Sequence, residues 1–134
     1  TDMGWSVRPI LMSLLEWGRG HIGGVTPDQI GQTLTADFVA RTLPALQFDA
    51  SRAPGLAATM TLEISDCSDC NSWTYEIHDG HIHPRRHAHE TADVALKTDT
   101  AGFFDFIRGT RPAEQCGELR GSPETAAAIQ DCFR

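Results

Sequence analysis

Hydrophobic and polar residues alternate with a period of two through the middle of the chain. In residues 56–64 every second side chain is a large apolar group or alanine, and Thr, Ala and Glu lie between them. Residues 73–77 repeat the pattern after a polar loop, and Asp79-Gly80 then signals a hairpin turn into residues 81–83. The alternation predicts three antiparallel strands with one buried face and one face in water.

A strand, a helix, a second strand and a second helix are predicted downstream. Residues 92–99 alternate as a half-buried strand does, and residues 117–121 form a shorter one. The first helix lies between these strands, and the second follows them up to residue 133. Their predicted boundary residues are Thr100 as an N-cap, Gly109 as a stop, and Ser122 and Pro123 as a start.

Two further helices are predicted upstream. Residues 6–17 carry Val, Ile and Leu at helical spacing, which makes one broad apolar stripe. Residues 35–43 form another helix, with Phe38, Val39 and Leu43 inward, that ends around Pro44 because proline removes a helical donor.

These elements together predict an α+β fold. Five strands form a mainly antiparallel sheet, helices pack on one face, and an extra helix precedes them. Residues 1–31 are assigned to an N-terminal helical arm and residues 32–134 to one compact domain. A chain of 134 residues that is 40% hydrophobic can bury a core of its own.

The carboxyl-terminal elements resemble the sterol carrier protein type-2-like family. The resemblance lies in the strand Ala92-Asp-Val-Ala-Leu-Lys-Thr-Asp99 and in the strand-to-helix step Gly117-Glu-Leu-Arg-Gly-Ser-Pro123. The chain also looks like the carboxyl-terminal domain of the mycothiol-dependent maleylpyruvate isomerase family and of alkyl sulfatases, where this fold serves binding or assembly. The resemblance implies an apolar tunnel for a lipid, sterol or acyl chain between sheet and helices, typically without a catalytic residue.

The charge and the hydropathy of the chain exclude two classes of partner. A net charge of -7 and a pI of about 5.2 argue against a nucleic-acid partner, which needs a basic face. No apolar run approaches the ~20 residues of a membrane span. The first residues show no signal-peptide pattern, so a cytoplasmic protein is expected.

No metal site or cofactor is predicted, although two clusters contain side chains of the metal-binding type. Cys67 and Cys70 have the spacing of half a zinc site or of a redox pair, but they lie in a polar loop. Five histidines gather between residues 78 and 89, and His81 and His83 share one face of a strand. A solvated, pH-sensitive hairpin and an all-imidazole surface site both remain open for them.

The aromatic and sulfur residues are the candidate ligand-binding residues. They fall on elements that face one another across the sheet and helix layers. The helix after Thr100 is apolar around most of its circumference, so it is either clamped on two sides or lines a cavity with one. The candidates are Phe38, Met60, Leu62, Trp73, Tyr75, Phe103, Phe104, Phe106 and Ile107.

The function predicted from these observations is a carrier that holds a hydrophobic small molecule, such as a lipid, sterol, acyl or polyketide-like ligand. Two alternatives stay open: a small cyclase or isomerase acting on a natural-product substrate, and an accessory domain of a larger enzyme system. No residue is selected as catalytic, because His78, His83, Asp79 and Tyr75 fit a general acid or base equally well. Three roles stay open for the N-terminal helix: it packs on the domain, serves as a lid, or binds a second copy of the chain.

Overall fold

The computed structural model describes residues 35–67, 71–87 and 91–133. It also describes a few positions nearer the N-terminus, namely Ser6, Val7, Pro9, Ile10, Leu11, Ser13, Leu14, Trp17 and Asp28. Those between Ser6 and Trp17 are mostly helical, as the apolar stripe predicts. The proposed boundary between residues 31 and 32 lies outside the described residues.

The sheet has five strands in the order β3-β2-β1-β4-β5. Neighbouring strands are antiparallel except β1 and β4, which are parallel. The predicted α+β fold with a mainly antiparallel sheet is therefore confirmed. The strands are β1 (Ala58–Ile64), β2 (Ser72–His78), β3 (His81–Arg86), β4 (Val94–Thr98) and β5 (Glu118–Gly121).

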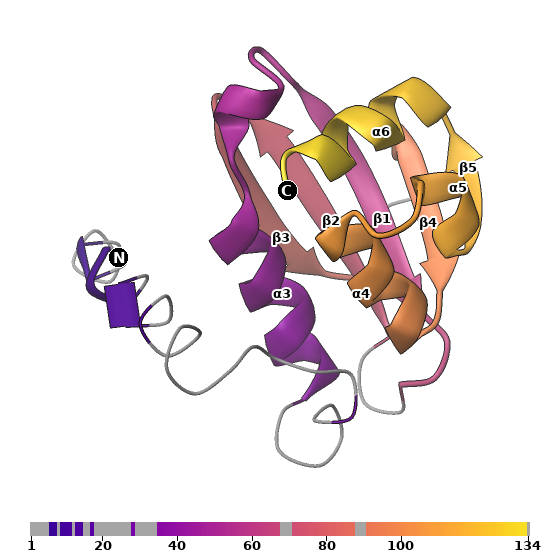
Figure 1. The fold of residues 1–134 in the computed structure, drawn as a ribbon, viewed down its shortest axis with the longest axis horizontal. Coiled ribbons are helices and arrows are strands. Elements are labelled where there is room, and N and C mark those ends of the chain that lie inside the picture. The colour runs from indigo at the N-terminus through magenta and orange to yellow at the C-terminus, as the bar shows by residue number, and fades with distance from the viewer. Residues whose placement is uncertain are drawn as a thin grey trace.

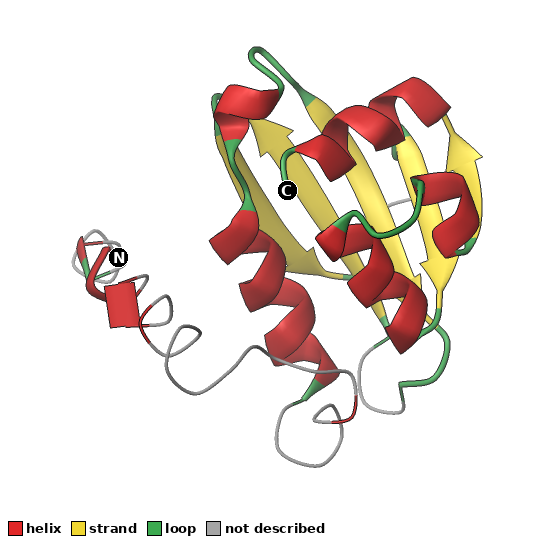
Figure 2. Ribbon diagram, in the orientation of Figure 1, coloured by secondary structure: helices red, strands yellow, loops and turns green. Residues whose placement is uncertain are grey.

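The helices cover one face of the sheet (Figure 1). One of them, α3, packs on β3, whereas α4, α5 and α6 pack on one another and over β4 and β5 (Figure 2). The helical layer thus has two parts, one above each side of the sheet. The helices are α3 (Ala36–Gln47), α4 (Thr100–Arg108), α5 (Ala113–Cys116) and α6 (Pro123–Asp131), with a 3₁₀ turn, η2, at Ala50–Arg52.

Pro44 lies inside α3, and the prediction that the helix ends around this residue is wrong. The helix continues to Gln47, and the Phe48 amide donates to the Pro44 carbonyl at 3.0 Å. A proline in this position cannot donate to the carbonyl four residues earlier, which is that of Ala40. The Tyr75 hydroxyl of β2 donates to the Ala40 carbonyl instead, at 2.6 Å. The sheet therefore supplies the donor that the helix lacks.

The start of α4 also differs from the prediction by one residue. Asp99, not Thr100, is the N-cap, and its carboxylate accepts from the Gly102 amide at 2.7 Å. Thr100 is the first helical residue, and its amide and hydroxyl both donate to Asp66 from the loop after β1. Two carboxylates thus neutralise the positive end of this helix. The predicted stop at Gly109 and the predicted start at Ser122-Pro123 are confirmed.

Candidate functional site

The predicted ligand-binding residues on the sheet lie together on its helix-covered face. Met60 is paired with Tyr75 and Leu62 with Trp73 across β1 and β2, so these four side chains form one patch. Each is at most 3% exposed. The period of two in the sequence is enough to place them on one face, because alternate residues of a strand point the same way.

The predicted residues of α4 complete the cluster from above. Phe103, Phe104, Phe106 and Ile107 are all buried and belong to the same apolar core as the sheet patch. The Phe103 and Phe104 rings meet edge to face at 5.7 Å, and the Arg108 guanidinium lies 5.1 Å from the centre of the Phe104 ring. This helix is covered on two sides, which was one of the two expectations for it.

Phe38 does not join the cluster, and the expectation that it points inward is wrong. Its side chain is 49% exposed on the outer side of α3. The inward positions of this turn are taken by Asp37, Val39 and Ala40, all of which are buried. The Asp37 carboxylate is buried where Phe38 was expected, because its hydrogen bonds stabilise the charge there.

Asp37 connects α3 to two strands. Its carboxylate accepts from the Trp73 indole at 3.0 Å, from Arg41 at 2.9 Å and from Arg86 at 2.8 Å. The hydrogen bond from Arg86 is the main reason why the pKa of Asp37 falls to about 2, against the opposing effect of burial. Sequence reasoning missed this clamp; the only signal was an aspartate in the first turn with an arginine four residues later.

The polar groups beneath the cluster are thus already engaged. Tyr75 donates to Ala40, and burial together with the charge of Asp37 raises the pKa of its hydroxyl. Among the described residues, every buried side-chain nitrogen or oxygen has a hydrogen-bond partner. This face of the sheet therefore offers an apolar surface.

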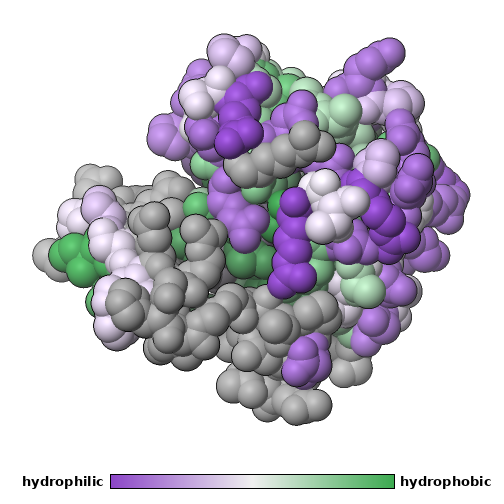
Figure 3. All heavy atoms as spheres, in the orientation of Figure 1, coloured by the Kyte–Doolittle hydropathy of each residue, from purple (hydrophilic) through white to green (hydrophobic). Residues whose placement is uncertain are grey.

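Three phenylalanines meet where the two parts of the helical layer adjoin. The ring of Phe133, just beyond α6, lies 6.1 Å from that of Phe48, just beyond α3, and 6.0 Å from that of Phe106 in α4. Both contacts are edge to face, at 65° and 63°. Figure 3, which looks onto this face, shows apolar atoms among the polar ones. Phe48 and Phe133 were not among the predicted site residues. Phe48 lies outside every predicted element, and Phe133, predicted to end the last helix, lies just beyond α6.

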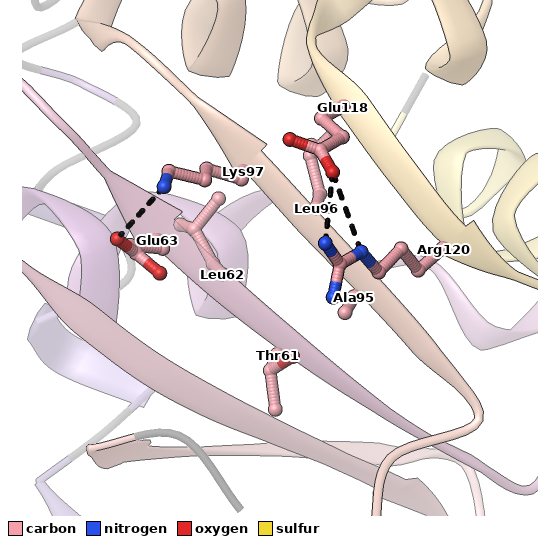
Figure 4. Close-up of a pocket in the computed structure, with 8 residues that line it drawn as sticks. All are labelled: Thr61, Leu62, Glu63, Ala95, Leu96, Lys97, Glu118 and Arg120. Atoms are coloured by element: carbon pink, nitrogen blue, oxygen red, sulfur yellow. Dashed lines mark hydrogen bonds and ion pairs between the residues drawn. The ribbon is translucent and has the colours of Figure 1, made fainter. Parts of the chain in front are cut away.

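The opposite face of the sheet is polar and carries an open hollow of about 210 Å³. Figure 4 shows Glu63 and Lys97 paired on one side of it, at 3.8 Å, and Glu118 and Arg120 paired on the other, at 3.1 Å. Glu63 and Lys97 follow buried Leu62 and Leu96, and Glu118 and Arg120 flank half-buried Leu119, so all four project away from the helices. Exposed pairs of this kind contribute little binding or stability.

The histidines of the β2–β3 hairpin lie at one end of that same polar face. His78 and His83 stack with ring centres 4.9 Å apart, and the His81 ring lies 6.3 Å from that of His83. His78 and Glu76 also line a second hollow with Asp93. Within the part of the chain that the structure describes, no three His, Cys, Asp or Glu side chains are placed to hold a metal ion.

The cysteines do not add to the site. Cys116 in α5 and Cys132 after α6 are buried, and burial raises the pKa of both thiols, so they act as small apolar residues. Cys67 is half-buried beside Thr100, 4.0 Å from its hydroxyl. Cys70 lies outside the described residues, so the predicted alternatives for the Cys67–Cys70 pair stay predictions.

Comparison with known proteins finds similar folds among solved structures. No model of a known protein family matches the chain, and no curated protein matches it either. The structure is similar to the stereoselective inverting sec-alkylsulfatase Pisa1 from Pseudomonas sp., with a TM-score of 0.62 and 18% identity over 78% of this chain. The matched part is only 17% of the alkylsulfatase chain. At this identity the likeness shows a shared fold.

Weaker likenesses are found to two further structures. One is the UbiJ-SCP2 ubiquinone synthesis protein, with a TM-score of 0.48 and 14% identity over 72% of this chain and 79% of that chain. The other is a GCN5-related N-acetyltransferase from Anabaena variabilis, with a TM-score of 0.41 and 14% identity over 60% of this chain and 21% of that one. Among the described residues, no helix has the length and apolar character to cross a membrane.

Proposed function

We propose that this chain binds a hydrophobic small molecule, such as a lipid, sterol, acyl or polyketide-like compound, between the sheet and the helices. The observation that carries the proposal is the divided helical layer. One part, α3, packs on β3, and the other, made of α4, α5 and α6, packs on β4 and β5. Both parts cover the continuous apolar face of the sheet. Where the two parts adjoin, Phe48, Phe106 and Phe133 fill the space with side chains that can change rotamer.

The energies favour entry of a ligand at this point. An acyl chain or sterol that buries roughly 300 Å² of apolar surface gains about 7 kcal/mol at ~25 cal/mol per Å². Separating aromatic rings costs about 0.5–1.5 kcal/mol for each edge-to-face contact. Only two such contacts join the rings of Phe48, Phe106 and Phe133. The gain exceeds the energy of these two ring contacts, and a ligand that packs against the displaced ring replaces the apolar area that the ring buried before.

Binding is favoured over catalysis because the polar groups near the apolar face of the sheet already have hydrogen-bond partners. Trp73 donates to Asp37 and Tyr75 donates to Ala40, so neither faces a ligand with an available proton. A cyclase or isomerase would need a polar side chain that touches its substrate. The candidates named from the sequence on the hairpin, His78 and His83, project from the polar face instead.

A second candidate function is that of an accessory domain in a larger enzyme. The alkylsulfatase Pisa1 supports it, because a region of similar fold makes up 17% of that chain. An accessory domain could still hold the apolar part of a substrate in the same place. A cytoplasmic location and the pairing of two copies through the N-terminal helix also stay predictions.

Native mass spectrometry of the purified protein, followed by organic extraction, tests the proposal. We expect a co-purifying hydrophobic molecule, or, for protein stripped of lipid, saturable binding of the uncharged fluorophore N-phenyl-1-naphthylamine. Lys97→Ala, on the polar face, is the matched control and should bind the probe as the unchanged protein does. A Kd weaker than about 100 µM, which is a binding free energy of less than about 5.5 kcal/mol, would reject the proposal.

A further inference from the structure

Phe133 lies at the centre of the three-ring contact. Its ring is the one that touches both of the others, and its side chain belongs to the core, with 5% exposed. The three rings come from segments far apart in the sequence. Phe48 follows α3, Phe106 lies within α4, and Phe133 follows α6. Phe133 thus joins the two parts of the helical layer across the proposed entrance.

More hydrogen bonds hold the segment around Phe133 on the α4 side than on the α3 side. Phe106 lies within a capped helix. The buried Gln130 amide donates to the carbonyls of Phe106 at 3.2 Å and Arg111 at 2.7 Å, and so anchors the end of α6. Beyond Gln130, one backbone hydrogen bond between described residues crosses to the α3 side: the Asp49 amide donates to the Cys132 carbonyl at 2.7 Å.

We propose that Phe133 is a gate, whose ring moves out of the space between Phe48 and Phe106 when a hydrophobic ligand enters. This inference rests on the proposed binding function. The gate moves at Cys132 and Phe133, whose amides leave the carbonyls of Ile129 and Gln130, while α6 stays in place because its last turn is anchored at Gln130. The two remaining rings, Phe48 and Phe106, then flank the ligand and favour flat or flexible apolar molecules over bulky branched ones.

Hydrogen exchange in the unchanged protein tests the movement. The probe is N-phenyl-1-naphthylamine at saturation. We expect exchange of the Asp49 amide to become about tenfold faster, because its partner, the Cys132 carbonyl, moves with Phe133. The Ala126 amide, which donates to Ser122 at the start of α6, is the internal control and should not change.

A Phe133→Ala variant tests the cost of opening the gate. In this variant the two ring contacts are absent before the probe binds, so the Kd should be roughly tenfold tighter. Phe133→Leu keeps apolar bulk without a ring, so its Kd should lie between those of the unchanged protein and Phe133→Ala. This variant serves as the test if Phe133→Ala does not fold. Phe38→Ala removes an exposed ring and should change nothing. A void the size of one phenyl ring is too small for this probe, so tighter binding needs a larger space behind the gate.

The outcomes separate the gate from the binding function. Probe binding with faster Asp49 exchange and a tighter Phe133→Ala variant supports both. Probe binding to the Phe133 variants alone overturns both, because the unchanged protein then admits no ligand past Phe133. Probe binding to the unchanged protein with unaltered Asp49 exchange, and with Phe133→Ala equal or weaker, overturns the gate and leaves the binding function intact. Failure of every folded variant to bind the probe overturns both.

Discussion

The Tyr75 hydroxyl donates to the Ala40 carbonyl at 2.6 Å, and this bond explains how α3 continues past a proline. Pro44 has no amide proton for the carbonyl four residues earlier, so Ala40 would otherwise keep a buried acceptor without a helical donor. The hydroxyl comes from the centre of β2, a strand that the sequence places 35 residues from Ala40. Sheet and helix therefore depend on each other at this point.

Tyr75→Phe should lower the free energy of unfolding by about 1–3 kcal/mol, because it leaves the buried Ala40 carbonyl without its donor. Urea denaturation measures this change. Pro44→Ala supplies the matched background, since alanine restores an amide that can donate to Ala40. In that background Tyr75→Phe should cost clearly less. Equal costs in the two backgrounds would show that the hydroxyl does not replace the proline's missing donor.

Asp37 should make stability depend on pH in the acid range. Its pKa falls from an ordinary 3.8 to about 2 in the folded chain. A lowered pKa contributes stability that is fully present above about pH 4 and is lost as the pH falls toward 2. This contribution is about 2 kcal/mol. Asp37→Asn should remove that part of the pH dependence in urea denaturation curves measured between pH 2 and 5.

The leading cause of the Asp37 pKa can be checked separately. Arg86→Gln removes the hydrogen bond that lowers this pKa most, while Arg41 and Trp73 remain. NMR titration of the Asp37 carboxyl should then give a value closer to 3.8. A pKa that stays near 2 in Arg86→Gln would mean that Trp73 and Arg41 suffice to hold the charge.

Gly121 should tolerate no side chain at the end of β5. It has a φ of +96°, and an added Cβ would lie 2.1 Å from the Asp93 carbonyl oxygen. Gly55 also has a positive φ, +76°, but nothing lies within 4 Å of its Cβ position. Gly55→Ala should thus cost only about 1 kcal/mol, and Gly121→Ala several kcal/mol. Similar melting temperatures for the two variants would contradict this account.

The sheet could be predicted from the sequence because its two faces differ in polarity. Met60 and Leu62 alternate with Thr61 and Glu63, and the structure puts the first pair under the helices and the second pair on the polar face. Phe38 could not be placed in this way. Its orientation depends on Asp37, whose partners Trp73 and Arg86 come from distant strands.

The candidate site was predictable as a set of residues on one face, and less so in its details. Trp73 and Tyr75 follow from the strand period, and Phe103 and Ile107 from the helical one. Phe48 follows from neither, and Phe133, predicted to end the last helix, lies just beyond α6. Their contact depends on how the two parts of the helical layer meet, which no local pattern encodes.

The most direct test of hydrophobic binding between sheet and helices is an NMR measurement with methyl-labelled protein. At saturation, N-phenyl-1-naphthylamine should give intermolecular NOEs to the methyl groups of Met60 and Leu62 on the sheet and of Ile107 on α4, which belong to the core between sheet and helices. Thr61 and Ala95 carry methyl groups beside the hollow on the polar face and act as the control. NOEs confined to Thr61 and Ala95, or no NOEs to the protein at all, would contradict the account.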